Sequence, residues 1–254
     1  MASLSAVIIT YNEEKNIGRC LESLKDVADE IVVVDSFSTD KTKEIAGKYD
    51  VKFIEHSFEG YIEQKNYAFS LASNAYVLSL DADEALSIEL KESIMEEKKD
   101  FSADAYSMNR LTSYCGKWIR HCGWYPDRKT RLVNKNMGHW GGTNPHDKMI
   151  MDEGAKIDHL NGDLLHYSYY NRQDHLEQIE HFSEIGAREL FGKGKKYLWI
   201  KIYVSPFAKF VRDYLIKAGF LDGKAGYDIS RLSAWATYRK YKKLKMLRDG
   251  SAKS

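Results

Sequence analysis

The sequence predicts an α/β protein with a doubly wound mixed β-sheet, followed by a helical, basic C-terminal extension. Over the first hundred residues, short apolar runs rich in β-branched residues alternate with segments of helical spacing, which is typical of βαβ units. Polar clusters follow three of these runs, as expected where open α/β sheets bind ligands beyond the carboxyl ends of their strands. The last third of the chain carries an excess of basic residues.

Four strands and four helices are expected within residues 1–100. The predicted strands are short apolar runs, and they cover residues 4–10, 30–35, 51–55 and 76–80. Between the strands, apolar residues recur at helical spacing, and Thr39 or Asp40 and then Ser87 are suited to cap helix N-termini. The predicted helices cover residues 16–24, 39–49 and 61–72, and a fourth begins at Ser87.

The remaining chain predicts a second part of the sheet and then helices. Short alternating segments lie between loops rich in Gly, Asn and Trp, which indicates a mixed or antiparallel extension. These segments are residues 105–111, 130–134, 148–151 and 163–167. Residues 171–190 are expected to be helical, and two more helices are expected to begin near Pro206 and Gly226. We therefore predict a catalytic domain over 1–170, with halves 1–100 and 101–170, and a helical extension over 171–254.

The composition favours a folded protein of a reducing compartment. At 43% apolar and 30% charged residues, the chain is neither disordered nor a bundle of membrane helices. Three cysteines (Cys20, Cys115 and Cys122) make no disulfide framework. The first residues lack the features of a signal peptide, and no stretch approaches the ~20 apolar residues of a spanning helix. We therefore expect a cytoplasmic protein.

Two carboxylates follow the fourth predicted strand. Asp81 and Asp83 are separated only by Ala82, so both lie at the end of that strand. A divalent cation (Mg²⁺ or Mn²⁺) and substrate phosphates would relieve the repulsion between them. The alternative is that they only support the helix that begins near Ser87, where acidic residues are also favourable. Acidic residues at two earlier strand ends favour the cation site.

Several segments resemble family 2 glycosyltransferases in their order and context. They are VIITYNEEKNI, EIVVVDSFSTDKT, QKNYA and YVLSLDADE. The resemblance implies the GT-A (Rossmann-like) fold and an inverting reaction with a nucleotide-sugar donor. Later segments, GKWIRHCGWYPD, LLHYSYY and GFLDGKAG, resemble one branch, the lipopolysaccharide core glycosyltransferases, often described as β-1,4-glucosyltransferases.

The resemblance implies roles for the residues of the donor site. Thr10, Tyr11 and Glu13 line the nucleoside pocket, with Tyr11 beside the base and Glu13 near the ribose. Asp35 accepts a hydrogen bond from the base imide. Lys65 lies near the diphosphate, which an acidic pocket can hold only if a lysine and a cation neutralise it.

The same resemblance places Asp81 opposite the ribose and Asp81-Ala82 against the nucleotide sugar. It also implies that Asp83 binds the metal, and that this metal bridges the diphosphate. The chain departs from the family at the second strand end. Ser36 replaces a common Asp, and Phe37 replaces a common Gly. Because a non-glycine residue resists positive φ, we expect this turn to differ from that of the family.

Inversion requires a base that deprotonates the acceptor hydroxyl, and a positioned carboxylate contributes ~10²–10⁴-fold. The family takes this base from a motif after the Asp-x-Asp pair. Between Asp104 and Asp147 the one acid is Asp127, which follows Pro126. The alternative is that Asp127 is an ordinary turn residue. We predict Asp127 as the base.

A late histidine often adds a metal ligand in GT-A enzymes, and His166 and His146 compete for this role. We prefer His166, which follows an apolar run, although a single histidine is also common in a packed core. His146 would then contact the acceptor. Trp124 and Tyr125 are expected to form a platform for the acceptor sugar. Arg120 and Arg131 are expected to contact a phosphorylated core sugar.

Charge divides sharply along the chain. Residues 1–187 hold 21 Lys and Arg against 32 Asp and Glu, whereas residues 188–254 hold 17 against 5. After Pro206, apolar residues recur at helical spacing with basic residues beside them (the apolar positions are Phe207, Phe210, Val211, Tyr214 and Leu215). Such a helix suits an anionic membrane surface, which predicts contact through residues 193–248. The alternative is a solvated basic face. No nucleic-acid module accompanies the charge, so no nucleic-acid partner is expected.

These features predict an inverting, metal-dependent glycosyltransferase. It would transfer a hexose, glucose from UDP-glucose, to a lipopolysaccharide inner core or similar glycolipid, as a peripheral protein on the cytoplasmic face of the inner membrane. A nucleotidyltransferase is one alternative, but its first strand would be followed by a Gly-rich basic loop rather than Tyr11-Asn12-Glu13-Glu14. A non-catalytic scaffold that binds glycan or membrane is the other, and the retained carboxylates at 81, 83 and 127 argue against it.

Overall fold

The computed structural model describes residues 2–144, 146–194 and 199–250. The chain forms two compact units. The first, here the sheet unit, comprises Met1–Arg110 and Asp127–Tyr167, and the second, the helical unit, comprises Leu111–Pro126 and Ser168–Ser254. The segment Leu111–Pro126 therefore groups with the C-terminal helices, whereas the sequence alone suggested a single boundary at residue 170.

The main sheet is mixed and has the strand order β3-β2-β1-β4-β8-β6-β11-β5, most of which belongs to the sheet unit. β7 pairs with the end of β6 that belongs to the helical unit. The first four strands are parallel, and the strands added by the second half of the chain pair antiparallel with β4 and with one another. The parallel strands are β1 (Leu4–Thr10), β2 (Glu30–Asp35), β3 (Lys52–Glu55) and β4 (Tyr76–Asp81). The others are β5 (Glu84–Leu86), β6 (Ala105–Tyr114), β7 (Lys117–Trp118), β8 (Asp127–Asn134) and β11 (Ile157–Tyr169). The predicted doubly wound mixed sheet is thereby confirmed.

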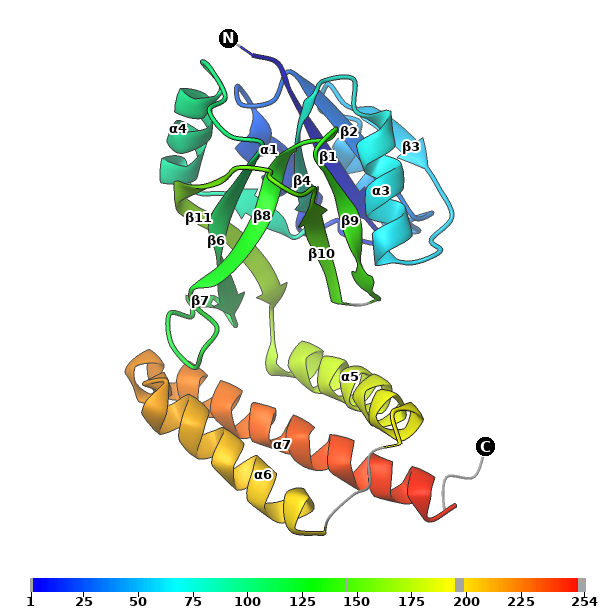
Figure 1. Cartoon of the computed structure of the whole chain (residues 1–254), viewed down its shortest axis with the longest axis vertical. Helices are drawn as coiled ribbons and strands as arrows, with labels where there is room; N and C mark the ends of the chain where they lie inside the picture. Colours follow the sequence, from blue (N-terminus) through cyan, green and yellow to red (C-terminus); the bar gives the residue numbers. More distant parts are fainter. Residues whose placement is uncertain (1, 145, 195–198, 251–254) are drawn as a thin grey trace. The chain divides into compact units, whose positions relative to one another are not determined.

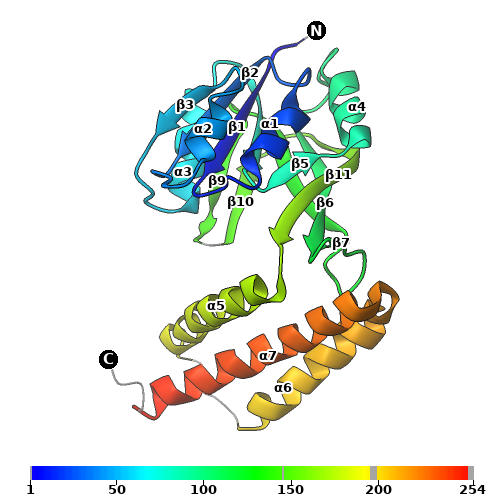
Figure 2. The same cartoon turned by 180° about the vertical axis from the view of Figure 1, so that it is seen from behind.

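Helices cover both faces of this sheet (Figures 1 and 2). They are α1 (Ile17–Leu24), α2 (Thr42–Ala46), α3 (Tyr61–Leu71) and α4 (Ile88–Glu97). Alternate residues of β1 point to opposite faces, so Leu4 and Ile8 pack with α1, α2 and α4, while Val7 packs with α3. A two-stranded hairpin, β9 (Gly138–Thr143) and β10 (His146–Met151), lies on the α3 side.

The turn after β2 keeps a left-handed residue although the sequence places phenylalanine there. Phe37 has φ of +61° and an exposed side chain. Phenylalanine therefore adopts here the left-handed conformation that a non-glycine residue resists. Two hydrogen bonds hold the turn, since the Asp35 carboxylate accepts from the backbone N–H of Ser38 at 2.7 Å and from its hydroxyl at 2.5 Å. These bonds offset the ~1–2 kcal/mol that a left-handed non-glycine residue costs.

The helical unit contains α5 (Arg172–Gly192), α6 (Trp199–Val211) and α7 (Gly223–Arg248), with a π-helical turn at Arg212–Ile216 and a 3₁₀ turn at Gly219–Asp222. The prediction that a helix begins near Pro206 is wrong, because the apolar run from Trp199 extends that helix toward its N-terminus and Pro206 lies inside it. Within the described residues, no helix has both the length and the apolar character needed to cross a bilayer.

Candidate active site

Three polar strand ends meet in the sheet unit, as the sequence predicted. β1 lies between β2 and β4, and the register places Thr10 opposite Asp35 and Ile9 opposite Asp81. The carboxyl ends of these parallel strands therefore form one edge. This edge is where an α/β sheet binds its ligands.

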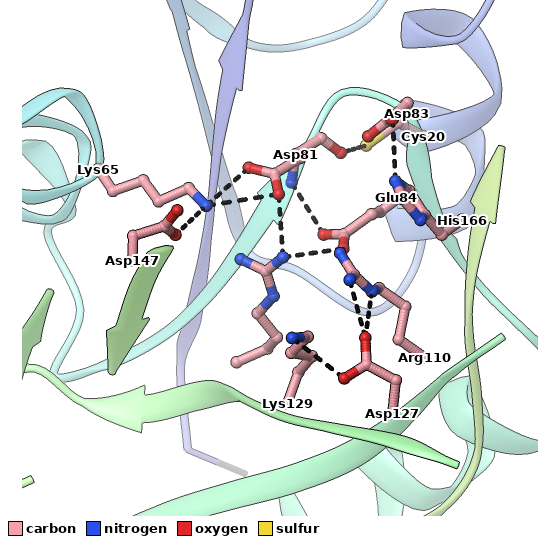
Figure 3. Close-up of polar contacts among 11 residues, drawn as sticks. Cys20, Lys65, Asp81, Asp83, Glu84, Arg110, Asp127, Lys129, Asp147 and His166 are labelled. Atoms are coloured by element: carbon pink, nitrogen blue, oxygen red, sulfur yellow. Dashed lines mark hydrogen bonds and ion pairs between the residues drawn. The ribbon is translucent and has the colours of Figure 1, made fainter. Parts of the chain in front are cut away.

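Asp81 is held between two cations at this edge (Figure 3). The ammonium of Lys65, from α3, lies 3.0 Å from Asp81 Oδ1, and Nη2 of Arg131, from β8, lies 2.9 Å from Asp81 Oδ2. Burial raises the pKa of Asp81, but the charges of Lys65 and Arg131 outweigh burial and hold this pKa well below its usual value. Asp81 is therefore ionised throughout the physiological pH range.

Arg131 joins Asp81 to a second buried carboxylate. Its Nη2 also lies 2.8 Å from Oε1 of Glu84, and Glu84 accepts the backbone N–H of Asp81 at 3.0 Å. Burial lowers the pKa of Arg131, but the two carboxylates raise it further, so the guanidinium stays charged. Arg131, which the sequence analysis predicted to contact the acceptor, is thus paired with carboxylates at the strand end. Sequence reasoning gave Glu84 no role, although it directly follows Asp83.

Buried N–H groups near Arg131 lack protein acceptors. Nε and Nη1 of Arg131 and the indole N–H of Trp140 have no hydrogen-bond partner in the described part of the chain. Arg131 and Trp140 line a pocket of about 470 Å³ together with Lys65 and Asp81. Because an unsatisfied buried donor costs about 1–3 kcal/mol, oxygen atoms of an anionic ligand would stabilise this arrangement.

The β9–β10 hairpin adds Asp147 to the same pocket, a residue for which the sequence suggested no donor-site role. Asp147 Oδ2 accepts from the Lys65 ammonium at 2.7 Å, and Trp140 lies 4.5 Å from that ammonium. Strand pairing opposite Gly142 fixes the position of Asp147. In the sequence, the feature that could have indicated a role for Asp147 is its position beside His146. The backbone of His146 lies in β10, but its side chain lies outside the described residues.

Asp127 begins β8, and two cations contact it. Nη2 and Nε of Arg110 lie 2.8 Å and 3.0 Å from Asp127 Oδ2, and the ammonium of Lys129 lies 3.1 Å from Oδ1 (Figure 3). Arg110 and Lys129 also line the pocket that contains Asp81. The candidate base is therefore held by ion pairs to two residues that line this pocket, and the sequence gave no sign of these partners.

Asp83 and His166 are brought together from distant parts of the chain. Oδ2 of Asp83 lies 3.1 Å from Nε2 of His166. Two ligands at right angles, each about 2.1 Å from a Mg²⁺-like ion, are about 3 Å apart, so this pair fits two neighbouring coordination positions. No group of three His, Cys, Asp or Glu side chains suited to a metal gathers within residues 2–144, 146–194 and 199–250. A bound ion would therefore take further ligands from substrate oxygens or water.

The same edge contains the residues that the resemblance assigns to a nucleoside pocket. The ring of Tyr11 is exposed, and Asp35 and Thr10 are buried. The Thr10 hydroxyl has no hydrogen-bond partner among the described residues. Burial raises the pKa of Glu13 to about 7, and nearby Asp83 and Asp40 add to the rise, while a 2.7 Å hydrogen bond from Asn16 opposes it. Glu13 can therefore donate as well as accept near neutral pH.

The predicted acceptor residues of the segment before Asp127 belong to the helical unit. Trp124 packs against Tyr114 and Tyr169 with ring centroids 6.1 Å and 5.7 Å away. The guanidinium of Arg120 lies 5.2 Å from the centre of the Tyr125 ring. Contact of these side chains with an acceptor remains a prediction.

Comparison with known protein families gives one match that covers more than half of the chain. The profile described as Glycosyl transferase family 2 matches residues 5–155. The chain is 33% identical to an uncharacterized glycosyltransferase of Rickettsia conorii, over 99% of this chain and 92% of that protein. It is 28% identical to the lipopolysaccharide core biosynthesis glycosyltransferase LpsC of Rhizobium meliloti, over 94% of this chain and 93% of LpsC.

Among solved structures, the chain is similar in fold to a mannosyltransferase of Pyrobaculum calidifontis, solved with GDP-mannose and Mn²⁺. The TM-score is 0.51 at 15% sequence identity, covering 98% of this chain and 88% of that one. This likeness concerns the fold, and it agrees with the GT-A architecture expected from the sequence.

Proposed function

The chain belongs to glycosyl transferase family 2, and from this premise we propose that it transfers glucose from UDP-glucose to the inner core of a lipopolysaccharide or a similar glycolipid. Membership of the family confirms the predicted enzyme class, a glycosyltransferase of the GT-A fold, over the nucleotidyltransferase and the non-catalytic scaffold. The name of LpsC supports the acceptor class. The observation that carries the donor proposal is the pocket at the strand ends, with its unsatisfied N–H groups on Arg131 and Trp140.

The donor pocket is proposed to bind the nucleotide sugar along the edge of the sheet. Tyr11 and Asp35 take the base, Glu13 the ribose, and Asp81-Ala82 the junction with the sugar. Lys65 and Arg131 lie beside the diphosphate end, where the charges of both and the unsatisfied N–H groups of Arg131 stabilise negative charge. Since both cations are already positioned by Asp81, little reorganisation is needed when the donor binds.

We propose Asp83 and His166 as the protein ligands of a divalent cation, Mg²⁺ or Mn²⁺. When bound, such an ion stabilises the negative charge of the departing diphosphate. The two side chains offer a carboxylate oxygen and an imidazole nitrogen 3.1 Å apart, which suits either metal. Loss of His166 is expected to weaken metal affinity more than donor affinity, since the base and the uridine contact other residues.

The reaction is a single displacement. The acceptor hydroxyl gives its proton to a carboxylate as its oxygen forms the bond to the anomeric carbon. The bond from that carbon to the diphosphate breaks, UDP leaves, and the configuration inverts. We propose Asp127 as this base, held in place by Arg110 and Lys129. Asp147 is its rival, because it lines the pocket that contains Asp81 and forms an ion pair with Lys65.

A membrane surface is the proposed second partner, through α6. Three aromatic residues of α6 are largely exposed, with Trp199 at 72%, Tyr203 at 66% and Phe207 at 70%. Aromatic side chains on an exposed helix face in a basic segment suit the interface of an anionic bilayer. We therefore propose that the protein binds the cytoplasmic face of the inner membrane, where its glycolipid acceptor would be.

A donor screen that measures UDP release, with a truncated core oligosaccharide as acceptor, tests this function. We expect UDP-glucose to be the best donor and activity to require Mg²⁺ or Mn²⁺. Asp127→Asn and Asp147→Asn form a matched pair, and the variant that loses ~10²–10⁴-fold in kcat identifies the base. Full activity of Asp127→Asn would remove Asp127 from this role. Absence of UDP release with every nucleotide sugar would contradict the proposal as a whole.

A further inference from the structure

The helical unit contains a pocket of its own, of about 670 Å³, with walls from three helices. Its walls are mainly apolar, from Leu176 of α5, Ile202, Tyr203 and Pro206 of α6, and Leu232, Ala234, Trp235 and Tyr238 of α7. The volume falls in the range of about 300–1,000 Å³ typical of pockets that bind small molecules. None of the residues assigned to the donor site belongs to it.

Two arginines line the same pocket. Arg172, the first residue of α5, and Arg231 of α7 are both exposed, and neither forms an ion pair within the described ranges. Several other cations of this unit form ion pairs with carboxylates. Lys209 lies 2.5 Å from Asp213, and Arg239 lies 2.6 Å from Glu180. Positive charge at this pocket is therefore left for a ligand.

We propose that this pocket binds the hydrocarbon chain of one anionic lipid, with Arg172 and Arg231 contacting its negatively charged headgroup. The apolar walls exclude a nucleotide or a free sugar, whose hydroxyls would lose their hydrogen bonds to water. The arginines favour an anionic headgroup over a neutral or cationic one. A lipid with a hydrocarbon chain and an anionic headgroup can contact the apolar walls and the two arginines at the same time.

The position of Tyr203 connects this pocket to the proposed membrane surface. Tyr203 lines the pocket, and it also belongs to the exposed face of α6 with Trp199 and Phe207. A lipid chain can therefore enter from the bilayer on which α6 is proposed to lie. The inference rests on the proposed membrane contact for the source of the lipid, but the pocket itself binds a lipid monomer without a bilayer.

The experiment separates binding in the pocket from contact with a bilayer. The full chain is titrated with lysophosphatidylglycerol below its critical micelle concentration, followed by calorimetry and by tryptophan fluorescence, to which Trp235 contributes. We expect saturable binding of one lipid per chain. Lysophosphatidylcholine with the same acyl chain is expected to bind roughly tenfold more weakly, because its headgroup has no net charge.

Three variants make the test specific. Ala234→Trp fills the pocket and is expected to abolish binding of the monomer. The double variant Arg172→Gln/Arg231→Gln is expected to weaken it roughly tenfold and to remove the preference for the anionic lipid, and it keeps the test decisive if Ala234→Trp does not fold. Phe207→Ser lies on the exposed face and outside the pocket. It is expected to reduce flotation with anionic vesicles while leaving monomer binding unchanged.

No saturable binding to the wild-type chain, or equal binding to a folded Ala234→Trp variant, overturns the proposal. Turnover of UDP-sugar with a soluble acceptor is measured in parallel. Because neither Ala234 nor the two arginines belong to the donor pocket, we expect this turnover to persist in the variants. Intact turnover without lipid binding would thus contradict the lipid site and not the proposed glycosyl transfer. Lipid binding without turnover would contradict the proposed glycosyl transfer and not the lipid site.

Discussion

The pocket of the sheet unit and the pocket of the helical unit both contain arginine, but its surroundings differ. In the sheet unit Arg131 is buried and contacts two carboxylates, Asp81 and Glu84. In the helical unit Arg172 and Arg231 are exposed beside apolar walls, without carboxylate partners among the residues that the structure describes. In the sheet unit, carboxylates of the protein hold the arginine in place before a ligand binds. In the helical unit, the ligand itself would have to supply the negative charge.

The largest effect is expected from breaking the buried charge cluster. Arg131→Met leaves Asp81 and Glu84 without a shared cation, which we expect to lower the free energy of unfolding by about 3–5 kcal/mol and to abolish donor binding. Urea denaturation and UDP titration measure the two effects. The matched control is Lys129→Met, a partly exposed partner of Asp127, which should cost less than about 1 kcal/mol. Equal losses in the two variants would contradict the comparison.

Glu13 makes the stability of the sheet unit depend on pH. Burial raises the pKa of Glu13 to about 7, above its value in the unfolded chain, so the folded state binds more protons between about pH 4.5 and pH 7. The free energy of unfolding should therefore fall by about 1–3 kcal/mol as the pH rises through this window, and then level off. Denaturation of the wild type and of Glu13→Gln at pH 5 and pH 7.5 measures this. In Glu13→Gln the free energy of unfolding should no longer fall between these two pH values. If it falls as much as in the wild type, other groups cause the pH dependence.

The helical unit depends instead on close backbone packing at Gly226. A Cβ atom there would lie 1.8 Å from the carbonyl oxygen of Gly219. We expect Gly226→Ala to destabilise this unit by about 1–3 kcal/mol, seen by thermal unfolding, with little change in UDP affinity. Gly192→Ala is the control, because a Cβ at Gly192 meets no atom within 4 Å. It should be neutral or slightly stabilising, and similar losses in both variants would exclude the packing argument.

The smallest effect is expected at the turn after β2. Phe37→Gly relieves the left-handed strain, whereas Phe37→Ala keeps it, although both variants lose the exposed ring. The glycine variant should be more stable than the alanine variant by about 1 kcal/mol in chemical denaturation. If the alanine variant were the more stable one, the strain would be relieved elsewhere in the turn.

The sequence predicted the sheet unit more accurately than the helical unit. β1 and β2 fall at the predicted residues because their apolar, β-branched runs end at polar residues. The helix that begins at Trp199 was misplaced, because Pro206 suggested a start where the helix only loses one hydrogen bond. Among the site residues, the strand-end carboxylates were predictable from position. The partners Arg110, Glu84 and Asp147 were not, because their contacts join residues that are far apart in the sequence.

The pairing of Asp83 with His166 also bears on the order in which the chain folds. Asp81, Asp83 and Glu84 leave the ribosome together, long before Arg110, Arg131 and His166, the residues that contact them. During synthesis this acidic cluster has only Lys65 nearby among its eventual cationic partners. β5 likewise cannot pair with β11, its antiparallel neighbour, until β11 has been synthesised. Because these contacts are non-local, the candidate active site should assemble late and slowly, after the first βαβ units have formed. A nascent chain would thus acquire activity only when β11 is complete.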